Sequence, residues 1–588
     1  MQHARSTMER WITDWTPSPR WPHYTRANAG EVLPTPASPL GQQFSWEKGM
    51  LLGWRDGYVR SGNYALEEFD PILPEAIGFF GGYFYINLAN VRMQGVRNPV
   101  VTVEQLDMAF FGDHPDVPKY VAHPDDEQPG YTEKILGHLG WLMSTSTWPE
   151  IDEEKTTTIA FRAQRRDLRS LTDAQLVARA RSTQPMLHKL FESHALSSSG
   201  SGVAPGILFA VGQAIGDPSV PMKLVSGIGE VDSAEPSYVL WDLSRTINAS
   251  KELTDAFNGG VAGLLDRLHA STGSDGTAFL AAWDEFIVDF GSRGPNEWEI
   301  SSPTWETTPE IVLSALERIR FQSDAESPKS RNSVMANERV AAIADVRAKL
   351  AAMGDAGAEL AGQFEAALIA SNQLWFRERT KTNIVRVVHE GRMVFRELAR
   401  RHHEAGSLVQ PEHIFMLLDS ELETFTANPA SFKQTLAERY VQWQQLWTLE
   451  PPFFVKDAIV PPISTWPAKG TSSAVVAAVG ESIQGVAGCP GVARGRARVI
   501  TDPTDPLSLE PGEVLIAPLT DPAWTPLFVA ASAVVVNVGG QISHAIIVSR
   551  ELGLPCVVSA TDATVRIPTG ALVEVNGNTG TVTVLELP

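Results

Sequence analysis

At 588 residues the chain is long enough for about two to four domains, and 43% hydrophobic with 20% charged residues is an ordinary globular composition. The net charge of −21 argues against a nucleic-acid partner, because no basic block offsets it and the phosphate backbone would be repelled. The N-terminus lacks the apolar core of a signal peptide, and no apolar stretch approaches the roughly 20 residues that span a bilayer. With only two cysteines, Cys489 and Cys556, we expect a cytoplasmic protein without a membrane partner.

The N-terminal part divides by composition into two kinds of segment. Roughly the first 120 residues are rich in glycine, proline and aromatic residues, as in the run Gly81 to Asn87, which predicts turns and short strands. From Pro309 to about Arg401 apolar residues recur at spacings of three and four, which predicts long amphipathic helices. Leu171 to Glu192 and Glu252 to Ala270 show the same pattern. A mainly helical body with short strands packed on it is expected.

Two polar features of this body are candidates for binding. The turn that begins at Gly291 projects Arg293 and Glu297 from a loop, where charged groups more often bind or react than pack. Farther along, Arg377 and Lys381 are four residues apart and share a helix face. They belong to a basic stretch in an acidic protein, made by Arg377, Arg379, Lys381 and Arg386. For any one of these residues a solvated helix surface is the alternative.

A linker is predicted between residues 451 and 480. This stretch combines stiff proline pairs, Pro451-Pro452 and Pro461-Pro462, with the flexible run Gly470 to Ser473. It would separate a domain at 1–450 from a second domain at 481–588.

The C-terminal domain contains a strand that turns into a helix. Ala533 to Val538 is short and β-branched, and it ends at Gly539 and Gly540, which turn the chain. Ser543 is a good N-cap, and the following helix reaches Leu552 before glycine and proline end it. The next strand is expected at Cys556 to Val558.

His544 lies in the first turn of this predicted helix. Unpaired backbone N–H groups and the positive end of the helix dipole favour a bound anion there. Imidazole, with an ordinary pKa of about 6.5, is neutral and nucleophilic near pH 7. The position therefore suits a histidine that carries a phosphoryl group, the alternative being a histidine that merely caps a helix.

The sequence around His544 resembles the phosphohistidine (swivelling) domain of the phosphoenolpyruvate-utilising family, which includes phosphoenolpyruvate synthase, rifampicin phosphotransferase and phenylphosphate synthase. The resemblance is carried by the segments Gly488 to Val499, Leu519 to Leu527, Gly539 to Pro555 and Asn576 to Gly580. It implies that His544 is the phosphorylated residue and that Gly540 and Ser543 adjoin the phosphoryl group. Ile542 replaces a frequent threonine and Asn576 a usual aspartate.

The larger part of the chain resembles the helical acceptor-binding domain of rifampicin phosphotransferase and its relatives. The matching segments occur in order at Asn28 to Pro34, Ser38 to Leu40, Tyr85 to Asn87, Phe290 to Glu297, Ser302 to Trp305, Arg377 to Arg379, Leu398 to Arg401 and Pro411 to Phe415. The expected fold is multidomain, with a mainly α-helical acceptor-binding domain that has some β structure, followed by a small α/β swivelling phosphohistidine domain.

Relatives that use ATP alone carry an ATP-grasp domain ahead of the acceptor domain, and those that use phosphoenolpyruvate carry a barrel after the histidine domain. Neither is found here, so the resemblance implies a separate ATP-grasp subunit that supplies the phosphoryl group from ATP with Mg²⁺. Phenylphosphate synthase is split in this way, which implies a small hydroxylated, phenolic acceptor.

On this resemblance the acceptor domain carries the residues that receive the phosphoryl group. Arg293 would grip a phosphoryl oxygen, and Glu297 would hold Arg293 or act as the base. His389 is the other candidate base. Arg377, Arg379, Lys381 and Arg386 would attract the phosphoryl dianion. A phosphocarrier or regulatory protein without small-molecule turnover is the alternative function, and a degenerate relative that only binds a ligand is a third.

Overall fold

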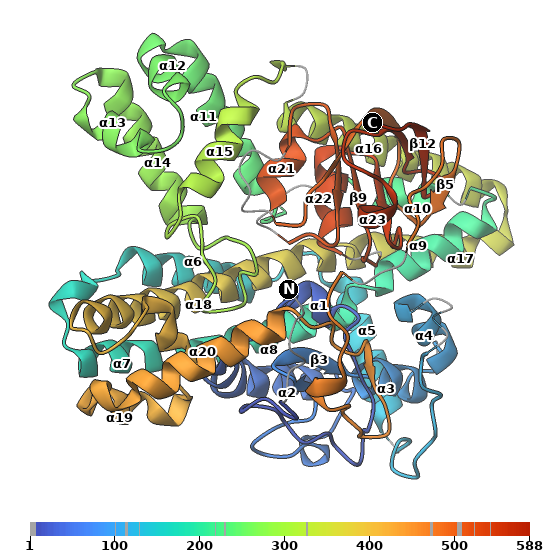
Figure 1. Ribbon diagram of the computed structural model, residues 1–588. Coiled ribbons are helices and arrows are strands. Elements are labelled where there is room, and N and C mark those ends of the chain that lie inside the picture. The colour runs from blue at the N-terminus through green and yellow to red at the C-terminus, as the bar shows by residue number, and fades with distance from the viewer. Residues whose placement is uncertain are drawn as a thin grey trace.

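The computed structural model describes residues 8–99, 101–111, 114, 116–128, 130–217, 219–228, 231–324, 327–470, 474–502, 509–521, 524–540 and 543–588. Of the motif residues named above, Gln541 and Ile542 lie outside the described part, as do 471–473, 522 and 523. The fold is a mainly helical N-terminal region joined to a C-terminal mixed β-sheet with helices, which confirms the predicted fold class (Figure 1).

The helices of the N-terminal region vary from single turns to the 32 residues of α18. They are α1 (Ala29–Val32), η1 (Gly41–Met50), α2 (Leu51–Arg60), η2 (Leu66–Glu68), α3 (Ala89–Arg97), α4 (Val103–Phe111), α5 (Tyr131–Ser144), α6 (Pro149–Ala163), η3 (Leu168–Ser170), α7 (Asp173–Arg181), α8 (Thr183–Gly200), α9 (Val203–Ala214), α10 (Val220–Leu224), α11 (Glu235–Ala249), α12 (Lys251–Asn258), α13 (Leu264–Ala270), α14 (Ser274–Phe290), α15 (Glu310–Ile319), α16 (Pro328–Ala352), α17 (Asp355–Ala370), α18 (Gln373–Glu404), η5 (Pro411–Met416), η6 (Asp419–Glu421), α19 (Leu422–Ala427), η7 (Pro429–Phe432), α20 (Lys433–Trp447) and η8 (Ile463–Thr465).

The three predicted helical stretches are helical. α7 and α8 cover the first, α12 and α13 the second, and α15 to α18 the third. α18 runs through the middle of the region, packed against α6, α7 and α8, and most of its residues are buried. A buried charge must be paired or strongly shifted in pKa. The basic stretch on α18 is therefore largely interior, not a solvated helix surface.

The first 120 residues contain the predicted short strands but also more helix than expected. Gly81 and Gly82, both with positive φ, form the turn between β2 (Ile77–Phe80) and β3 (Tyr83–Asn87). Glycines that looked like turn signals sit inside α2, where they allow close helix packing. A Cβ on Gly53 would approach the His188 carbonyl oxygen of α8 to 2.1 Å.

The predicted linker begins with residues that belong to the N-terminal core. β4 (Phe454–Val455) completes a four-stranded antiparallel sheet of order β2-β3-β1-β4, pairing with β1 (Tyr24–Thr25). Val455 and Ile463 are fully buried, and the Tyr85 hydroxyl donates to the Pro452 carbonyl oxygen at 2.8 Å. Residues 451–470 therefore pack as structure, and the connection between the two regions starts after them.

The C-terminal domain is built on an eight-stranded sheet of order β5-β12-β11-β7-β8-β9-β10-β6. The strands are β5 (Ser482–Gln484), β6 (Val486–Cys489), β7 (Val492–Val499), β8 (Val514–Ala517), β9 (Ala533–Val536), β10 (Cys556–Val558), β11 (Leu572–Asn576) and β12 (Thr581–Glu586). β7, β8, β9 and β10 run parallel to one another; α21 (Thr525–Ala530) connects β8 to β9, α22 (His544–Leu552) connects β9 to β10, and α23 (Ala563–Arg566) follows β10. Each parallel step requires such a crossover.

The predicted strand-turn-helix around the histidine is confirmed. β9 is followed by α22, which Gly553 ends with a φ of 62°, and β10 follows. In Figure 1 this domain, coloured orange to red, lies on the helical region above α18, with α22 packed against α16.

One helical segment differs from the expectation that no apolar stretch is long enough to span a membrane. Asp173 to Ala214 is long and apolar enough to cross a bilayer by length and composition, with a mean hydropathy of 1.2 and half of the apolar window buried in the fold. Leu187 and Leu190 of α8 lie in a core cluster with residues of α2 and α18, as expected for a core helix.

Candidate active site at the domain junction

His544 is the first residue of α22 and lies where the C-terminal domain meets the helical region. Ser543 takes the N-cap position with extended backbone (φ −69°, ψ 156°). Its hydroxyl is buried and has no hydrogen-bond partner among the described residues. A buried donor at a helix N-terminus is what a phosphoryl oxygen would need.

Two threonine hydroxyls hold the His544 ring. Thr520 Oγ1 lies 3.2 Å from Nδ1, and Thr525 Oγ1 lies 3.4 Å from Nε2. Phe528 packs edge-on against the ring at a centroid distance of 5.7 Å. If Thr520 accepts the Nδ1 proton, the lone pair on Nε2 is left for a phosphoryl group.

The environment keeps this imidazole neutral. Burial lowers the pKa of His544 well below its ordinary value, and the positive charges of Lys381, Arg293 and Arg377 lower the pKa further. A neutral ring is the nucleophilic form. The three cations come from the acceptor region, so the predicted cluster and the predicted histidine meet in the structure.

The cations are held in place by carboxylates. Arg293 Nη1 lies 3.0 Å from Glu297 Oε1, and Lys381 Nζ lies 3.3 Å from the same oxygen. Arg293 Nη2 also donates to Thr382 Oγ1 at 2.7 Å, and Arg377 pairs with Glu378 at 3.2 Å. Of the two roles predicted for Glu297, this geometry favours holding Arg293 over acting as a base.

Hydrogen bonds join the two regions beside the histidine. The Asn296 backbone N–H, in the loop that carries Arg293, donates to Asp521 Oδ2 at 2.7 Å. Asp521 follows Thr520 directly, so this bond links the loop to the residue that contacts His544. Asn332 Nδ2 of α16 donates to Glu551 Oε2 of α22 at 2.8 Å.

Arg379 and Arg386 of the predicted cluster have other partners. Arg379 pairs with Asp152 and Asp232 and lies over the Trp375 ring, 4.7 Å from its centroid. Arg386 donates to Asn383 Oδ1, and burial lowers its pKa to about 10. The partners of both arginines lie within the helical region. This corrects the expectation that Arg379 and Arg386 bind the phosphoryl group directly.

His389 is also placed differently from the prediction. Its Nε2 lies 2.8 Å from Glu306, and Arg392 donates to Nδ1 at 3.1 Å. The side chain is fully buried with both nitrogens engaged. No ring nitrogen is left to take a proton from an acceptor, so His389 is not the base.

Sequence reasoning missed Glu31. Burial raises the pKa of this carboxyl group on α1 to about 7, and the positive charges of Arg377 and Lys381 and the backbone amide of Gly540, in the turn before His544, oppose the rise. Gly540 was predicted to adjoin the phosphoryl group, and its carbonyl oxygen accepts the Ser543 N–H at 3.0 Å. The segment Asn28 to Pro34 was part of the family resemblance, but only packing brings it to the histidine.

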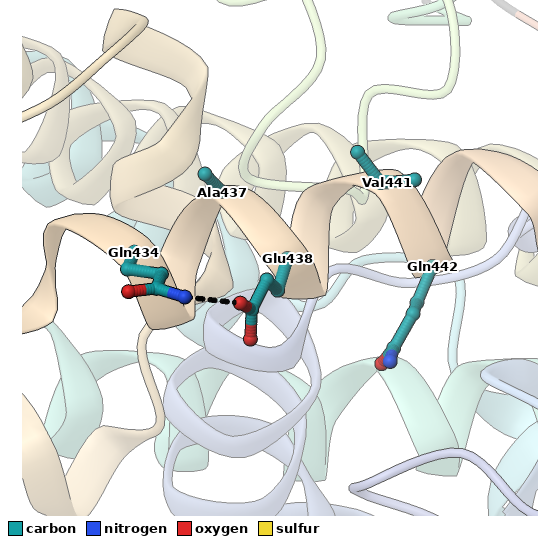
Figure 2. Close-up of a pocket in the computed structure, with 5 residues that line it drawn as sticks. All are labelled: Gln434, Ala437, Glu438, Val441 and Gln442. Atoms are coloured by element: carbon teal, nitrogen blue, oxygen red, sulfur yellow. Dashed lines mark hydrogen bonds between the residues drawn. The ribbon is translucent and has the colours of Figure 1, made fainter.

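A hollow of the surface lies away from this site. Figure 2 shows it on α20, where Gln434 donates to Glu438 at 2.8 Å beside Ala437 and Val441. It has no cation to meet a phosphoryl group. In the described ranges no group of three or more His, Cys, Asp or Glu side chains could hold a metal ion.

Comparison with known proteins identifies both regions. Residues 194–378 match the rifampicin phosphotransferase fourth domain, and residues 509–580 match the mobile domain of PEP-utilising enzymes. The first range includes Arg293, Glu297 and Arg377, and the second includes Thr520 and His544.

Curated relatives agree. An uncharacterised protein of Mycobacterium tuberculosis is 33% identical over 55% of this chain and 33% of its own length. The rifampicin phosphotransferase of Streptomyces sviceus is 27% identical over 61% of this chain and 40% of its own length. The phosphoenolpyruvate synthase of Aeropyrum pernix is 46% identical over 17% of this chain and 12% of its own length. The matched region thus spans about a third of the mycobacterial relative. The chain carries a rifampicin phosphotransferase fourth domain and a PEP-utilising enzyme mobile domain, and its homologues include rifampicin phosphotransferase.

Proposed function

We propose that this chain is the acceptor-binding and phosphohistidine part of a split phosphotransferase. A separate ATP-grasp subunit, with ATP and Mg²⁺, phosphorylates His544, and the chain passes the phosphoryl group to the hydroxyl of a small phenolic acceptor. The observation that supports this most directly is the docking of a buried, neutral His544 against Arg293, Arg377 and Lys381.

The geometry is suited to in-line phosphoryl transfer. In loading, His544 Nε2 forms a bond to phosphorus while the bond from phosphorus to the nucleotide oxygen breaks. In discharge, the acceptor oxygen bonds to phosphorus and the P–N bond breaks. Such transfers depend on positioning and charge neutralisation, which Lys381 and the two arginines supply.

Aromatic side chains beside the cations support an aromatic acceptor. His194, on whose ring the charges of Arg377 and Lys381 act, lies 5.7 Å from the ring of Trp298. Trp298 in turn packs with Phe191 at 6.1 Å. A phenol could rest on such rings with its hydroxyl toward the charges. The split architecture and the phenolic acceptor rest on the resemblance to phenylphosphate synthase.

Labelling tests the proposal. The chain is purified with an ATP-grasp protein encoded beside it and given ATP labelled in either the β- or the γ-phosphoryl group. We expect an acid-labile label on the wild-type chain and none on His544→Ala, and a phenol should then remove the label. If no such partner labels the chain, the proposal that this chain is part of a phosphotransferase is refuted. Label that no phenol, alcohol or pyruvate removes would favour a phosphocarrier.

A further inference from the structure

The transfer needs a group that takes the proton of the acceptor hydroxyl, and the two candidates from the sequence do not provide it. Glu297 holds Arg293 and Lys381, and both ring nitrogens of His389 have partners. Another histidine lies beside this group of charges. His194, on α8, is half-buried, and its imidazole ring could take a proton.

Two contacts place His194 next to the ion pair between Lys381 and Glu297, whose atoms lie 3.3 Å apart. His194 Nδ1 lies 3.0 Å from Thr380 Oγ1, and Thr380 directly precedes Lys381 on α18. The His194 ring also lies 5.7 Å from the ring of Trp298, which directly follows Glu297. Both partners of the ion pair therefore have a sequence neighbour in contact with His194.

The loop that carries this ion pair also contacts the histidine turn. Asn296, in the same loop, donates its backbone N–H to Asp521 Oδ2 at 2.7 Å. Thr520, the residue before Asp521, places its hydroxyl 3.2 Å from Nδ1 of His544. A continuous series of contacts and adjacent residues thus connects His194 with His544.

The Thr380 hydroxyl determines which nitrogen of His194 carries the proton. This hydroxyl donates to the Arg377 carbonyl oxygen at 3.0 Å, so its single hydrogen is used and its oxygen accepts from the ring. Nδ1 is therefore the protonated nitrogen and donates to Thr380. Nε2 keeps its lone pair and makes no hydrogen bond to a described residue.

The lone pair is on a side chain that an acceptor can reach. In the docked arrangement His194, Arg377 and Lys381 are half-buried and keep part of their surface in contact with solvent, whereas Arg293 and Glu297 are only 1% exposed. Arg377 and Lys381 share one face of α18, and Thr380 joins His194 to the same turn. An acceptor that approaches the two cations therefore also meets His194.

We propose that His194 is the general base of the transfer, a role that rests on the proposed function. The acceptor O–H gives its proton to His194 Nε2 as the acceptor oxygen bonds to phosphorus. The P–N bond breaks, and its electron pair returns to His544 Nε2. The proton then passes from His194 to solvent, with which the half-buried ring is in contact.

The electrostatics of the ring fit this role. Desolvation lowers the pKa of His194 well below its ordinary value, and the positive charges of Arg377 and Lys381 lower the pKa further. The ring is therefore neutral near pH 7, with its lone pair free. In the loose transition state of phosphoryl transfer the proton leaves the acceptor late, so a hydrogen-bond acceptor is sufficient at the start. The low pKa then favours release of the proton to solvent.

The variant His194→Asn separates the base from the contact with Thr380. The asparagine amide can still donate to Thr380 Oγ1, but no nitrogen remains at the position of Nε2. His194→Gln, which has a polar group there that cannot take a proton, is the second variant. His188→Asn is the matched control, since His188 is half-buried on the same helix and bonds to Asp56 of α2 at 2.7 Å.

The assay measures the label on His544 alone. Each full-length protein is treated with potassium phosphoramidate, and the label is measured by mass spectrometry. Cleavage after Arg498 and Arg550 releases a peptide in which His544 is the only histidine, so label on other histidines does not interfere. Loss of label is then followed with phenol, with 4-nitrophenol at pH 8, and with water alone.

We expect both His194 variants to load at the wild-type rate and to discharge to phenol about 100-fold more slowly, because general bases contribute about 10²- to 10⁴-fold. Discharge to 4-nitrophenol, which is already ionised at pH 8, should slow less than about 5-fold because no proton has to be removed. His188→Asn should match wild type with both phenols.

Equal discharge rates of wild type and the His194 variants with phenol would overturn the role of His194 as the base. Equal slowing with both phenols would also overturn it and would assign His194 to binding alone. If phenol does not speed the loss of label from wild type, the phenolic acceptor is refuted, and the same comparison with water decides the role of His194. A wild-type chain that takes no label on His544, while free histidine does, would overturn the proposed function and the role with it.

Discussion

At the residue scale, the reactivity of His544 depends on neighbours from another domain. Burial alone keeps the ring neutral, and Lys381, Arg293 and Arg377 act in the same direction. The same cations would stabilise the phosphoryl group once it is attached. One set of charges thus favours both the free nucleophile and its phosphorylated form.

Removing one of these charges should raise the pKa of His544. In Lys381→Met the pKa should move up toward the ordinary value but stay below it, because burial is the larger cause. An NMR titration of the ring, assigned with His544→Ala, measures this. Lys349→Met, which removes a cation paired with Asp217 and Asp345 on α16, is the control and should leave the His544 pKa unchanged. An unchanged pKa in Lys381→Met would mean that the domains do not dock in solution.

The Thr520 contact should orient the ring. Thr520→Val keeps the side-chain volume but removes the hydroxyl 3.2 Å from Nδ1. Loss of one hydrogen bond of about 1 kcal/mol predicts loading by phosphoramidate about 5-fold slower. Nitrogen-15 chemical shifts should show a mixed tautomer, and Thr520→Ser should restore both values. A single tautomer in the valine variant would show that Thr520 does not orient the ring.

At the element scale, one short helix and one long helix carry the charged residues discussed above. The four-residue helix α1 supplies Glu31, and one face of α18 supplies Arg377 and Lys381. A carboxylate placed there costs stability, because burial disfavours its charged form. This is the kind of local conflict that functional sites retain.

The raised pKa of Glu31 predicts that the stability of the folded protein depends on pH. The folded-state pKa of Glu31, about 7, is above the ordinary value of 4.5, so the folded protein holds this proton longer and stability falls as pH rises between those values. Glu31→Gln mimics the neutral form. Its melting temperature should match wild type near pH 4.5 and exceed it above pH 7. Burial also raises the pKa values of Asp14 and Glu154, to about 6 and about 7. Both residues are present in wild type and in Glu31→Gln, so their effects cancel in the difference between the two melting temperatures. If the difference in melting temperature between Glu31→Gln and wild type did not change with pH, this explanation would be wrong.

At the scale of the whole molecule, the C-terminal domain is docked on the helical region, and in the proposed function this is the arrangement in which the phosphoryl group is discharged. Polar contacts that join it to the helical region include Asn296 to Asp521, Asn332 to Glu551, Gln322 to the Val529 carbonyl oxygen and the ion pair of Arg318 with Glu510. His544 is only 9% exposed in this arrangement, so the proposed loading by a separate subunit would require the domain to move away.

A variant with a weakened contact between the two domains should therefore load His544 and discharge it at rates that change in opposite directions. Asp521→Ala removes the acceptor for the Asn296 N–H, and X-ray scattering should give a larger radius of gyration than wild type. Loading by phosphoramidate should become faster and discharge to an acceptor slower. Glu586→Gln, on the far strand β12, should change neither. A slower loading step would mean that docking is not what limits access to His544.

The sequence by itself determined the elements that depend on neighbouring residues. β9, the glycine turn, α22 and its end at Gly553 follow from β-branched residues, an N-cap and a C-terminal glycine within about 20 positions. Only the tertiary structure decided that Arg293 and Lys381 share Glu297, that His389 is buried against Glu306, that Arg379 and Arg386 have partners inside the helical region, and that residues 451–470 complete the N-terminal core. The physical reason is that burial and charge pairing join residues hundreds of positions apart, and no local pattern records which of several similar side chains packing will bring together.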